Sequence, residues 1–200
     1  MTVLKRMGNK PACAQIEYQL LAPQHFAAVI KLGNQVQGEN YLNAESLVQM
    51  YDKSWHNGVN ASLVALHQTA VVGFRLTYAA HHWQPDQWSS PDQWPVAADK
   101  VCYFKCNTVD ENLQGCGIGS KMLNMAIEQA KKQGAEAGLA HIWLASPGNS
   151  AFRYFSSNGG KLIKKHPGKW RHSSLFEGYI CPVCPGHCEC EAAEMILPFS

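Results

Sequence analysis

Apolar residues recur every three to four positions in two stretches near the start of the chain, which is the spacing of an amphipathic helix. The first stretch runs from His25 to Gln35 and the second from Ala44 to His56. Asn57 and Gly58 follow the second stretch and are residue types that end a helix. The polar, glycine-containing stretch from Gly33 to Asn43 predicts a loop between the two helices.

Shorter apolar runs predict β-strands. The runs Ser62 to His67 and Val71 to Tyr78 flank a short polar turn and predict a hairpin. Later strands are predicted at Val101 to Val109, Leu139 to Ala145, Lys161 to Lys165 and Glu194 to Phe199, with helices at Ser120 to Gln133 and Ser150 to Ser157. Two helices, a hairpin and then mixed strands and helices predict an α/β (α+β) fold in a single domain, residues 1–200.

A proline-containing stretch from His81 to Asp99 separates the hairpin from the next strand. It contains Trp83, Trp88 and Trp94 and repeats the tetrapeptide Pro-Asp-Gln-Trp. Long ordered loops often have a function. The tryptophans could equally fold back and cap the sheet, and the sequence leaves both interpretations open.

The segment from Gln114 to Lys121 is rich in glycine and lies between a predicted strand and a predicted helix. Glycines leave backbone N–H groups accessible, and the positive end of the following helix adds to them. This combination predicts a site for an anionic group such as a diphosphate.

Two common phosphate-binding patterns do not fit this segment. The Walker pattern fails because Ser120 and Lys121 follow Gly119 in the wrong order, and the dinucleotide pattern fails because Ser120 replaces its third glycine. The remaining pattern is Q-x-x-G-x-G, formed by Gln114, Gly117 and Gly119. It resembles the acetyl-CoA pyrophosphate loop of the GNAT superfamily of N-acetyltransferases. The alternative is a glycine-rich turn without a ligand.

A second segment, from Asn149 to Gly160, supports the same resemblance. It is similar to a family segment that reads Asn-x-Ala, then Phe-Tyr, then Gly-Gly or Gly-Phe. The two similar segments have the family's order and separation and lie within residues 101–160. The resemblance implies a mostly antiparallel mixed sheet with a central parallel, V-shaped strand pair flanked by helices.

The resemblance also implies where acetyl-CoA binds. The pantetheine arm is expected between the strands Val101 to Val109 and Leu139 to Ala145, which splay apart. The residues expected to contact the cofactor are Thr108, Val109, Gln114, Gly115, Cys116, Gly117, Ile118, Gly119, Ser120 and Asn149.

The catalytic acid is less clear, because the chain departs from the family pattern. The family's usual acid is a tyrosine four residues after the motif alanine, and that position is Phe155 here. Tyr154 is one residue earlier, about 100° around the helix. Tyr154 is the candidate acid. The alternative is that the thiolate leaves without a proton from a tyrosine. A thiolate is a tolerable leaving group near neutral pH, since free thiols have pKa values of about 8.5.

The sequence leaves the catalytic base open among several residues. The candidates are Glu39, His81, His82 and His141, and histidine titrates in the useful pH range. A chain of water molecules without a single base is an equal alternative.

A cysteine-rich segment, residues 181–190, lies before the last strand. Cys181, Cys184, Cys188 and Cys190 form a C-x-x-C pair and a C-x-C pair, with His187 between them. The C-x-x-C spacing lets two thiolates bind one zinc ion, which predicts a structural rather than catalytic zinc site. A redox pair or a turn with reduced thiols are the alternatives.

Composition and charge narrow the class of protein. The net charge of +2 comes without a dense basic stripe, so a nucleic-acid partner is not expected. No apolar run reaches membrane-spanning length, so no membrane partner is expected either. Met1 to Lys10 has basic residues but no following apolar core, so it does not predict a signal peptide. The expected location is the cytoplasm.

The sequence therefore predicts an N-acetyltransferase that uses acetyl-CoA and acts on a primary amine of a small molecule or a peptide. The acceptor is expected between the loop Gly38 to Asn43 and the stretch from His81 to Asp99, which we call the tryptophan loop. The indole rings there could face a cation. The alternative is a non-catalytic acyl-CoA-binding or zinc-binding regulatory module. Members of the family often dimerise, so a homodimer is a further expectation.

Overall fold

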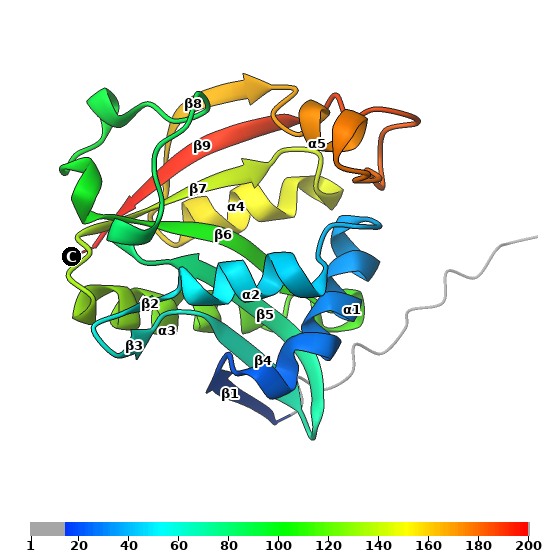
Figure 1. Cartoon of the computed structure of the whole chain (residues 1–200), viewed down its shortest axis with the longest axis horizontal. Helices are drawn as coiled ribbons and strands as arrows, with labels where there is room; N and C mark the ends of the chain where they lie inside the picture. Colours follow the sequence, from blue (N-terminus) through cyan, green and yellow to red (C-terminus); the bar gives the residue numbers. More distant parts are fainter. Residues whose placement is uncertain (1–14, 200) are drawn as a thin grey trace, which may run out of the picture.

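The computed structural model describes residues 15–199, and within them a seven-stranded sheet has the order β1-β4-β5-β6-β7-β9-β8 (Figure 1). Met1 to Lys10, the stretch tested above as a signal peptide, lies outside the described residues. The strands are β1 (Ile16–Leu20), β4 (Leu63–His67), β5 (Ala70–Tyr78), β6 (Val101–Val109), β7 (Ala137–Trp143), β8 (Lys161–Pro167) and β9 (Glu191–Pro198). Of the neighbouring pairs in this sheet, β6–β7 is parallel and the others are antiparallel. The predicted fold class is confirmed.

Helices cover both faces of the sheet (Figure 1). The helices α1 (Phe26–Gln37) and α2 (Ala44–Asp52) lie on one face, and α3 (Ile118–Lys132) and α4 (Ser150–Ser157) lie on the other. Apolar side chains fill a core on each face, which explains why β5 is buried over most of its length. A short helix, α5 (Arg171–Phe176), and the 3-10 turns η1 (Pro23–His25), η2 (Ala80–His82), η3 (Pro91–Gln93), η4 (Ala98–Lys100), η5 (Glu111–Leu113) and η6 (Pro147–Asn149) complete the elements.

The strands β6 and β7 form a V. Their parallel register begins at Val101 opposite Ala137 and ends at Tyr103 opposite Leu139. Beyond these residues both strands continue without pairing to each other. The register between β5 and β6 also shifts, which leaves Lys105 as an extra residue on β6. A β-bulge of this kind bends a strand, and here it lies where β6 leaves β7.

Two predicted boundaries near the N-terminus are wrong: the start of the loop at Gly33 and the end of the second helix at His56. The first helix continues through Gly33 to Gln37, because Gly33 packs against Leu42 and Phe74; an added Cβ would lie 2.7 Å from Leu42 Cδ1. The helix ends where Gly38 adopts a φ of 112°.

The second helix ends at Asp52, and the residues that follow form a small hairpin of β2 (Trp55–His56) and β3 (Val59–Asn60). Asn57 and Gly58 have φ angles of 50° and 74°. Two consecutive positive φ angles produce the tight turn typical of a two-residue hairpin. Asn57 and Gly58 therefore form the turn between β2 and β3 and do not directly follow the end of α2.

The remaining elements agree with the predictions apart from two omissions and small shifts. The bounds of β6 and α4 are as predicted, and the predicted hairpin is formed by β4 and β5. The strand β1 and the helix α5 were not predicted. Neither has a long apolar pattern, and β1 is stabilised by pairing with β4. In the described part of the chain, no helix combines the length and apolar character needed to cross a membrane.

Candidate active site

The glycine-rich segment forms an open turn between β6 and α3. Gly115 and Gly117 have φ angles of 84° and 76°, which glycine adopts without strain. A Cβ added at Gly117 would meet no heavy atom within 4 Å, so the turn leaves open space there. The helix begins at Ile118, and its first N–H groups have no carbonyl partner within the helix. With the positive helix end, these groups suit a diphosphate.

The end of β6 offers backbone rather than side-chain groups to a ligand. The buried Thr108 hydroxyl accepts a hydrogen bond from Gln37 Nε2 at 3.0 Å, which ties α1 to the strand. The Val109 carbonyl accepts a hydrogen bond from Gln114 Nε2 at 3.3 Å, so the Gln114 side chain closes the turn onto the strand. The edge of β6 beyond Tyr103 is unpaired toward β7, and such an edge can pair with an extended, amide-bearing ligand.

Tyr154 on α4 faces the glycine turn. Its hydroxyl donates to the Gly119 carbonyl at 3.0 Å and accepts a hydrogen bond from Arg75 Nη1 at 3.2 Å. Burial raises the pKa of Tyr154, and the nearby Arg75 guanidinium partly offsets this. The hydroxyl is therefore protonated at neutral pH and can donate a proton. Phe155 instead points into the core, where an added Cβ on Gly160 would lie 2.2 Å from its ring.

Several buried polar atoms around the turn have no partner. Arg75 is 1% exposed, and its guanidinium lies 4.4 Å from the centre of the Phe104 ring. Among the described residues, five buried side-chain polar atoms lack a hydrogen bond. Two of them lie beside the turn: Arg75 Nε, next to Tyr154, and Asn107 Oδ1, next to Gly119. A third, Asn149 Oδ1, lies just before α4. Leaving such atoms unpaired is costly. Together with the open turn and the unpaired strand edge, they fit a polar, extended ligand such as acetyl-CoA.

His141 is the candidate base that lies at the apex of the V, the point where β6 and β7 separate. It stands on β7 two residues after Leu139, the last residue paired with β6. Its Nε2 lies 2.6 Å from the Trp88 carbonyl, which can only accept, so Nε2 carries the proton. Its Nδ1 therefore accepts a hydrogen bond from the Tyr103 hydroxyl at 3.0 Å. Trp83 stacks on the Tyr103 ring at 5.0 Å and holds it in place.

The structure places the other candidate bases away from this apex. His81 and His82 follow the C-terminal end of β5 and cluster with His56 through ring contacts of 5.2 and 5.3 Å. Because β5 is antiparallel to β6, that end lies at the closed end of the V. Glu39 lies in the loop between α1 and α2, where its carbonyl accepts a hydrogen bond from the Ile180 amide.

The burial of His141 predicts a pH dependence of stability. Burial lowers the pKa of His141 to about 4, whereas a histidine in an unfolded chain has a pKa of about 6.5. Between these values the unfolded chain binds more protons, so the free energy of unfolding falls as the pH drops. The contribution is at most about 3 kcal/mol. His141→Gln, which can still donate to the Trp88 carbonyl, should lose less Tm than the wild type between pH 6.5 and 4. Equal losses in thermal melts would contradict this.

The tryptophan loop caps the sheet, which favours the second of the two interpretations given above. Trp83 Nε1 donates to the Val101 carbonyl at 2.8 Å, and the buried Trp94 donates to Glu194 at 3.0 Å. Lys169 lies over the Trp88 ring at 5.6 Å. The three rings therefore hold the loop and its neighbours together.

The structure brings the four cysteines of residues 181–190 together. Their sulfur atoms all lie within 4.8 Å of one another. The Cys181–Cys190 and Cys184–Cys190 sulfur distances are 3.8 and 3.5 Å. His187 is not part of this group: its Nε2 lies 2.7 Å from Glu189 Oε1, and its side chain is 53% exposed.

The sequence reasoning missed two residues of the site. Arg75 had a detectable signal, because it is the one charged residue in the apolar run from Val71 to Tyr78. Tyr103 had none, since a tyrosine on a central strand is usually a packing residue. Only the register of β6 against β7 brings Tyr103 beside His141.

Comparisons with known proteins agree with this geometry. The acetyltransferase (GNAT) family profile matches residues 21–159. The fold is similar to that of yncA, a putative acetyltransferase from Salmonella typhimurium solved with acetyl-CoA (14% identity, TM-score 0.67, covering 94% of this chain and 95% of that chain). It is also similar to the ribosomal-protein-S18-alanine N-acetyltransferase of Escherichia coli (13% identity, TM-score 0.65, covering 93% and 95%).

A third similar structure is Arabidopsis thaliana Naa50 in complex with the bisubstrate analogue CoA-Ac-MVNAL (13% identity, TM-score 0.62, covering 93% and 100%). No curated protein sequence matches the chain. At these identities the similarity to the solved structures concerns the fold.

Proposed function

Because the chain belongs to the acetyltransferase (GNAT) family, we propose that it transfers an acetyl group from acetyl-CoA directly to a primary amine. The observation that carries this proposal is the splayed β6–β7 pair with the open glycine turn at its mouth. This arrangement joins an amide edge, for an extended arm, to the N–H groups at the start of α3, for a diphosphate.

The chain's own groups provide the proposed binding site. Backbone amides of Gly115 and of residues 117–120 hold the diphosphate, whereas the Cys116 amide donates to the Leu113 carbonyl at 3.4 Å. The edge of β6 at Thr108 and Val109 pairs with the arm. The unpaired Oδ1 atoms of Asn107 and Asn149 are free to accept hydrogen bonds from the arm's amides. Bound acetyl-CoA supplies the acetyl group as a thioester.

The proposed base is the Tyr103–His141 pair. The transfer forms a bond between the amine nitrogen and the acetyl carbon and breaks the carbon–sulfur bond, releasing a proton and a thiolate. Burial raises the pKa of Tyr103, so its hydroxyl is protonated at neutral pH. Tyr103 can take the amine proton while passing its own to the neutral Nδ1 of His141. Because burial lowers the pKa of His141 to about 4, the pair then passes this proton on to solvent and does not keep it. A chain of water molecules without a single base remains the alternative.

The proposed acid is Tyr154, which protonates the leaving thiolate. We expect Tyr154→Phe to lower kcat about 100-fold, because one positioned proton donor is lost. The alkaline limb of the pH–rate profile should also move, since the acid must be protonated to act. The measurement is kcat against pH for the wild type and the variant. Phe155→Tyr is the control, because its hydroxyl would enter the core and not the site. An unchanged kcat and profile in Tyr154→Phe would remove Tyr154 from the mechanism.

The acceptor that we propose to test first is a peptide N-terminus. Among the similar structures, one carries a peptide-based bisubstrate analogue and another is named for a ribosomal protein. A small-molecule amine is the second class. The acceptor side of the site is the α1–α2 loop together with the segment between β8 and β9, which lies against it.

The experiment that tests the function combines binding and turnover. Calorimetric titration of acetyl-CoA should show saturable binding, and a hundredfold excess over Kd should add about 2.7 kcal/mol of stability. Acetyl transfer to a panel of peptides and small amines should then show turnover. Binding without turnover on any amine would favour the non-catalytic acyl-CoA-binding module. An absence of binding would overturn both interpretations.

We also propose that the chain binds a structural zinc ion and that it is located in the cytoplasm. The close approach of four reduced cysteines supports a metal ligand set in a reducing compartment.

A further inference from the structure

The sulfur atoms of the four cysteines have the spacing of a tetrahedral metal site. Zinc–thiolate bonds are about 2.3 Å long, so a regular ZnS₄ tetrahedron places its sulfur atoms about 3.8 Å apart. The two sulfur–sulfur distances of 3.8 and 3.5 Å match this spacing. They are far longer than the roughly 2.05 Å of a disulfide. The group therefore fits a shared ion better than a cross-link.

The Cys184 sulfur accepts a hydrogen bond from the backbone N–H group of Glu189 at 3.5 Å. An outer hydrogen bond of this kind orients a ligand and stabilises the thiolate that a metal requires.

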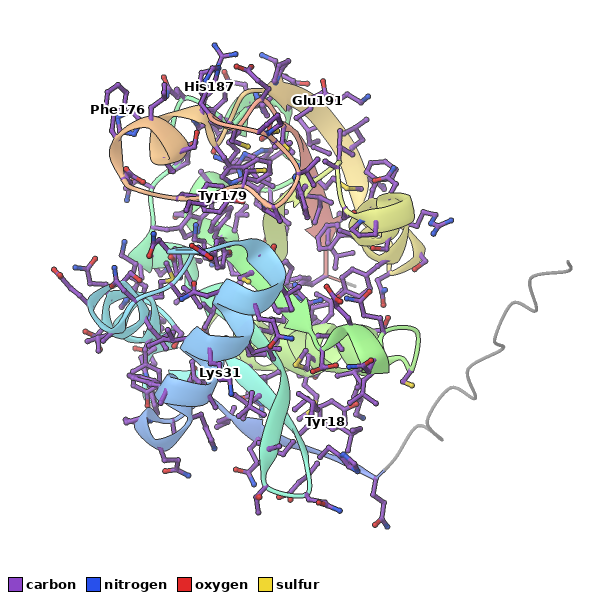
Figure 2. All side chains as sticks on the ribbon, turned by 90° about the vertical axis from the view of Figure 1, so that its right-hand side faces the viewer. Tyr18, Lys31, Phe176, Tyr179, His187 and Glu191 are labelled. Atoms are coloured by element: carbon purple, nitrogen blue, oxygen red, sulfur yellow. The ribbon has the colours of Figure 1, made fainter. Side chains whose placement is uncertain are left out.

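The chain immediately before this group is attached to the acceptor side of the site. We call residues 178–180 the docking segment. The Ile180 amide donates to the Glu39 carbonyl at 3.1 Å, the Tyr179 hydroxyl to the Gln37 carbonyl at 3.0 Å, and Asn40 Nδ2 to the Gly178 carbonyl at 3.0 Å. Figure 2 shows Tyr179 between the orange segment that carries the cysteines and the end of α1, drawn in blue. The two segments are therefore fastened together by both backbone and side-chain hydrogen bonds.

The packing at this contact is close. A Cβ added to Gly38 would lie 2.2 Å from the Ile180 carbonyl oxygen. An open cavity of about 520 Å³ lies here, lined from both sides by Asn34, Gln35, Gly38, Glu39, Ile180 and Pro182. Pro182 is the residue directly after Cys181. The position of one metal ligand therefore sets one wall of this cavity.

The contact continues to the cofactor strand. The Gln37 carbonyl accepts from Tyr179, and the Gln37 side chain donates to Thr108 at 3.0 Å. The end of α1 is thus held on one side by the docking segment and on the other by β6. A change in the cysteine group can reach the acceptor loop through these contacts without passing through the glycine turn.

We propose that the four cysteines bind one zinc ion and that this ion holds the docking segment against the α1–α2 loop, forming the acceptor-side wall. The acceptor part of this inference rests on the proposed acetyltransferase function, whereas the metal part does not. The ion shapes the wall and takes no part in the chemistry, because its four thiolates leave no open coordination position.

The metal part is tested by elemental analysis of full-length protein purified without added metal. We expect about one zinc per chain, which is the stoichiometry of a four-thiolate structural site. Cys184→Ser and Cys188→Ser should each lose the zinc. His187→Gln is the matched control in the same loop, and it should keep the zinc because His187 faces Glu189. A zinc content near zero, or variants that keep their zinc, would overturn the proposal.

The coupling part is tested by hydrogen exchange, which needs no activity. Chelation of zinc should speed exchange of the Ile180 amide and of residues 38–43 by at least about tenfold, because their contacts open locally. Exchange in α3 should stay unchanged. Unchanged exchange in residues 38–43 after complete loss of zinc would show that the ion does not support the acceptor loop.

The variant Tyr179→Phe then tests the role of the acceptor-side wall independently of metal binding. It removes the hydrogen bond to Gln37 and should keep its zinc. In an active enzyme it should raise the acceptor KM about tenfold, with little change in kcat or in acetyl-CoA binding. If no amine is acetylated at all, the zinc and exchange results still decide the metal site, while the proposed function fails separately. An unchanged acceptor KM in an active variant would contradict the role of the wall.

Discussion

Gly117→Val should weaken the binding of acetyl-CoA more than any other single substitution proposed here. Gly117 precedes the first residue of α3 and has a φ of 76°. A valine would add a branched side chain in the open space of the turn, next to the N–H groups proposed to hold the diphosphate. We expect the affinity to fall at least about 100-fold, equivalent to about 2.8 kcal/mol. Calorimetric titration measures it.

Gly134→Val is the matched control, because it separates backbone strain from loss of the site. Gly134 lies just after the other end of α3, has a φ of 91° and also has no heavy atom within 4 Å of an added Cβ. Both substitutions should cost about 1–2 kcal/mol of stability through the left-handed conformation. Only Gly117→Val should lose acetyl-CoA. Equal affinities in the two variants would show that the glycine turn does not bind the diphosphate.

Tyr103→Phe should lower kcat by about 100-fold or more while leaving acetyl-CoA affinity within about twofold. The substitution keeps the ring that stacks on Trp83 and removes the hydroxyl that donates to His141. Loss of a positioned proton-transfer group costs roughly 10²–10⁴ in rate. The readouts are kcat over a range of pH and calorimetric binding of acetyl-CoA.

Two further variants test whether Tyr103 and His141 act together and whether the loss of kcat is specific to the Tyr103 hydroxyl. His141→Gln should lower kcat in the same range, and the double variant should lose little more than either single variant, because the two groups act as a unit. Tyr51→Phe is the control phenol. Its ring packs on Phe26 and Trp55 in the α1–α2 layer, so kcat should not change. A Tyr103→Phe variant with normal kcat would leave the water chain as the route for the amine proton.

The proposed cofactor side of the site has sequence signals because these signals are local. The glycine spacing from Gln114 to Gly119 and the periodicity of β6 and α4 depend on neighbouring residues in the chain. Backbone freedom at glycine and side-chain periodicity act over a few residues. The predicted bounds of β6 and α4 are confirmed for that reason.

The acceptor side could not be read in this way, because its contacts join distant parts of the chain. Tyr179 donates to Gln37 across 142 positions, and Asn40 donates to Gly178 across 138. No local pattern encodes such pairs. Likewise, β1 forms because β4 offers it an edge, and the first helix passes through Gly33 because Leu42 and Phe74 occupy the space beside it.

Local residue patterns alone predict the fold class, the order of most elements, the glycine turn and the group of four cysteines. Packing in three dimensions opens the V after Tyr103, turns Tyr154 rather than Phe155 toward the glycine turn, and brings the chain just before the cysteines against the α1–α2 loop. Local conformation follows from adjacent residues, whereas strand register and long-range packing depend on which surfaces can be buried together.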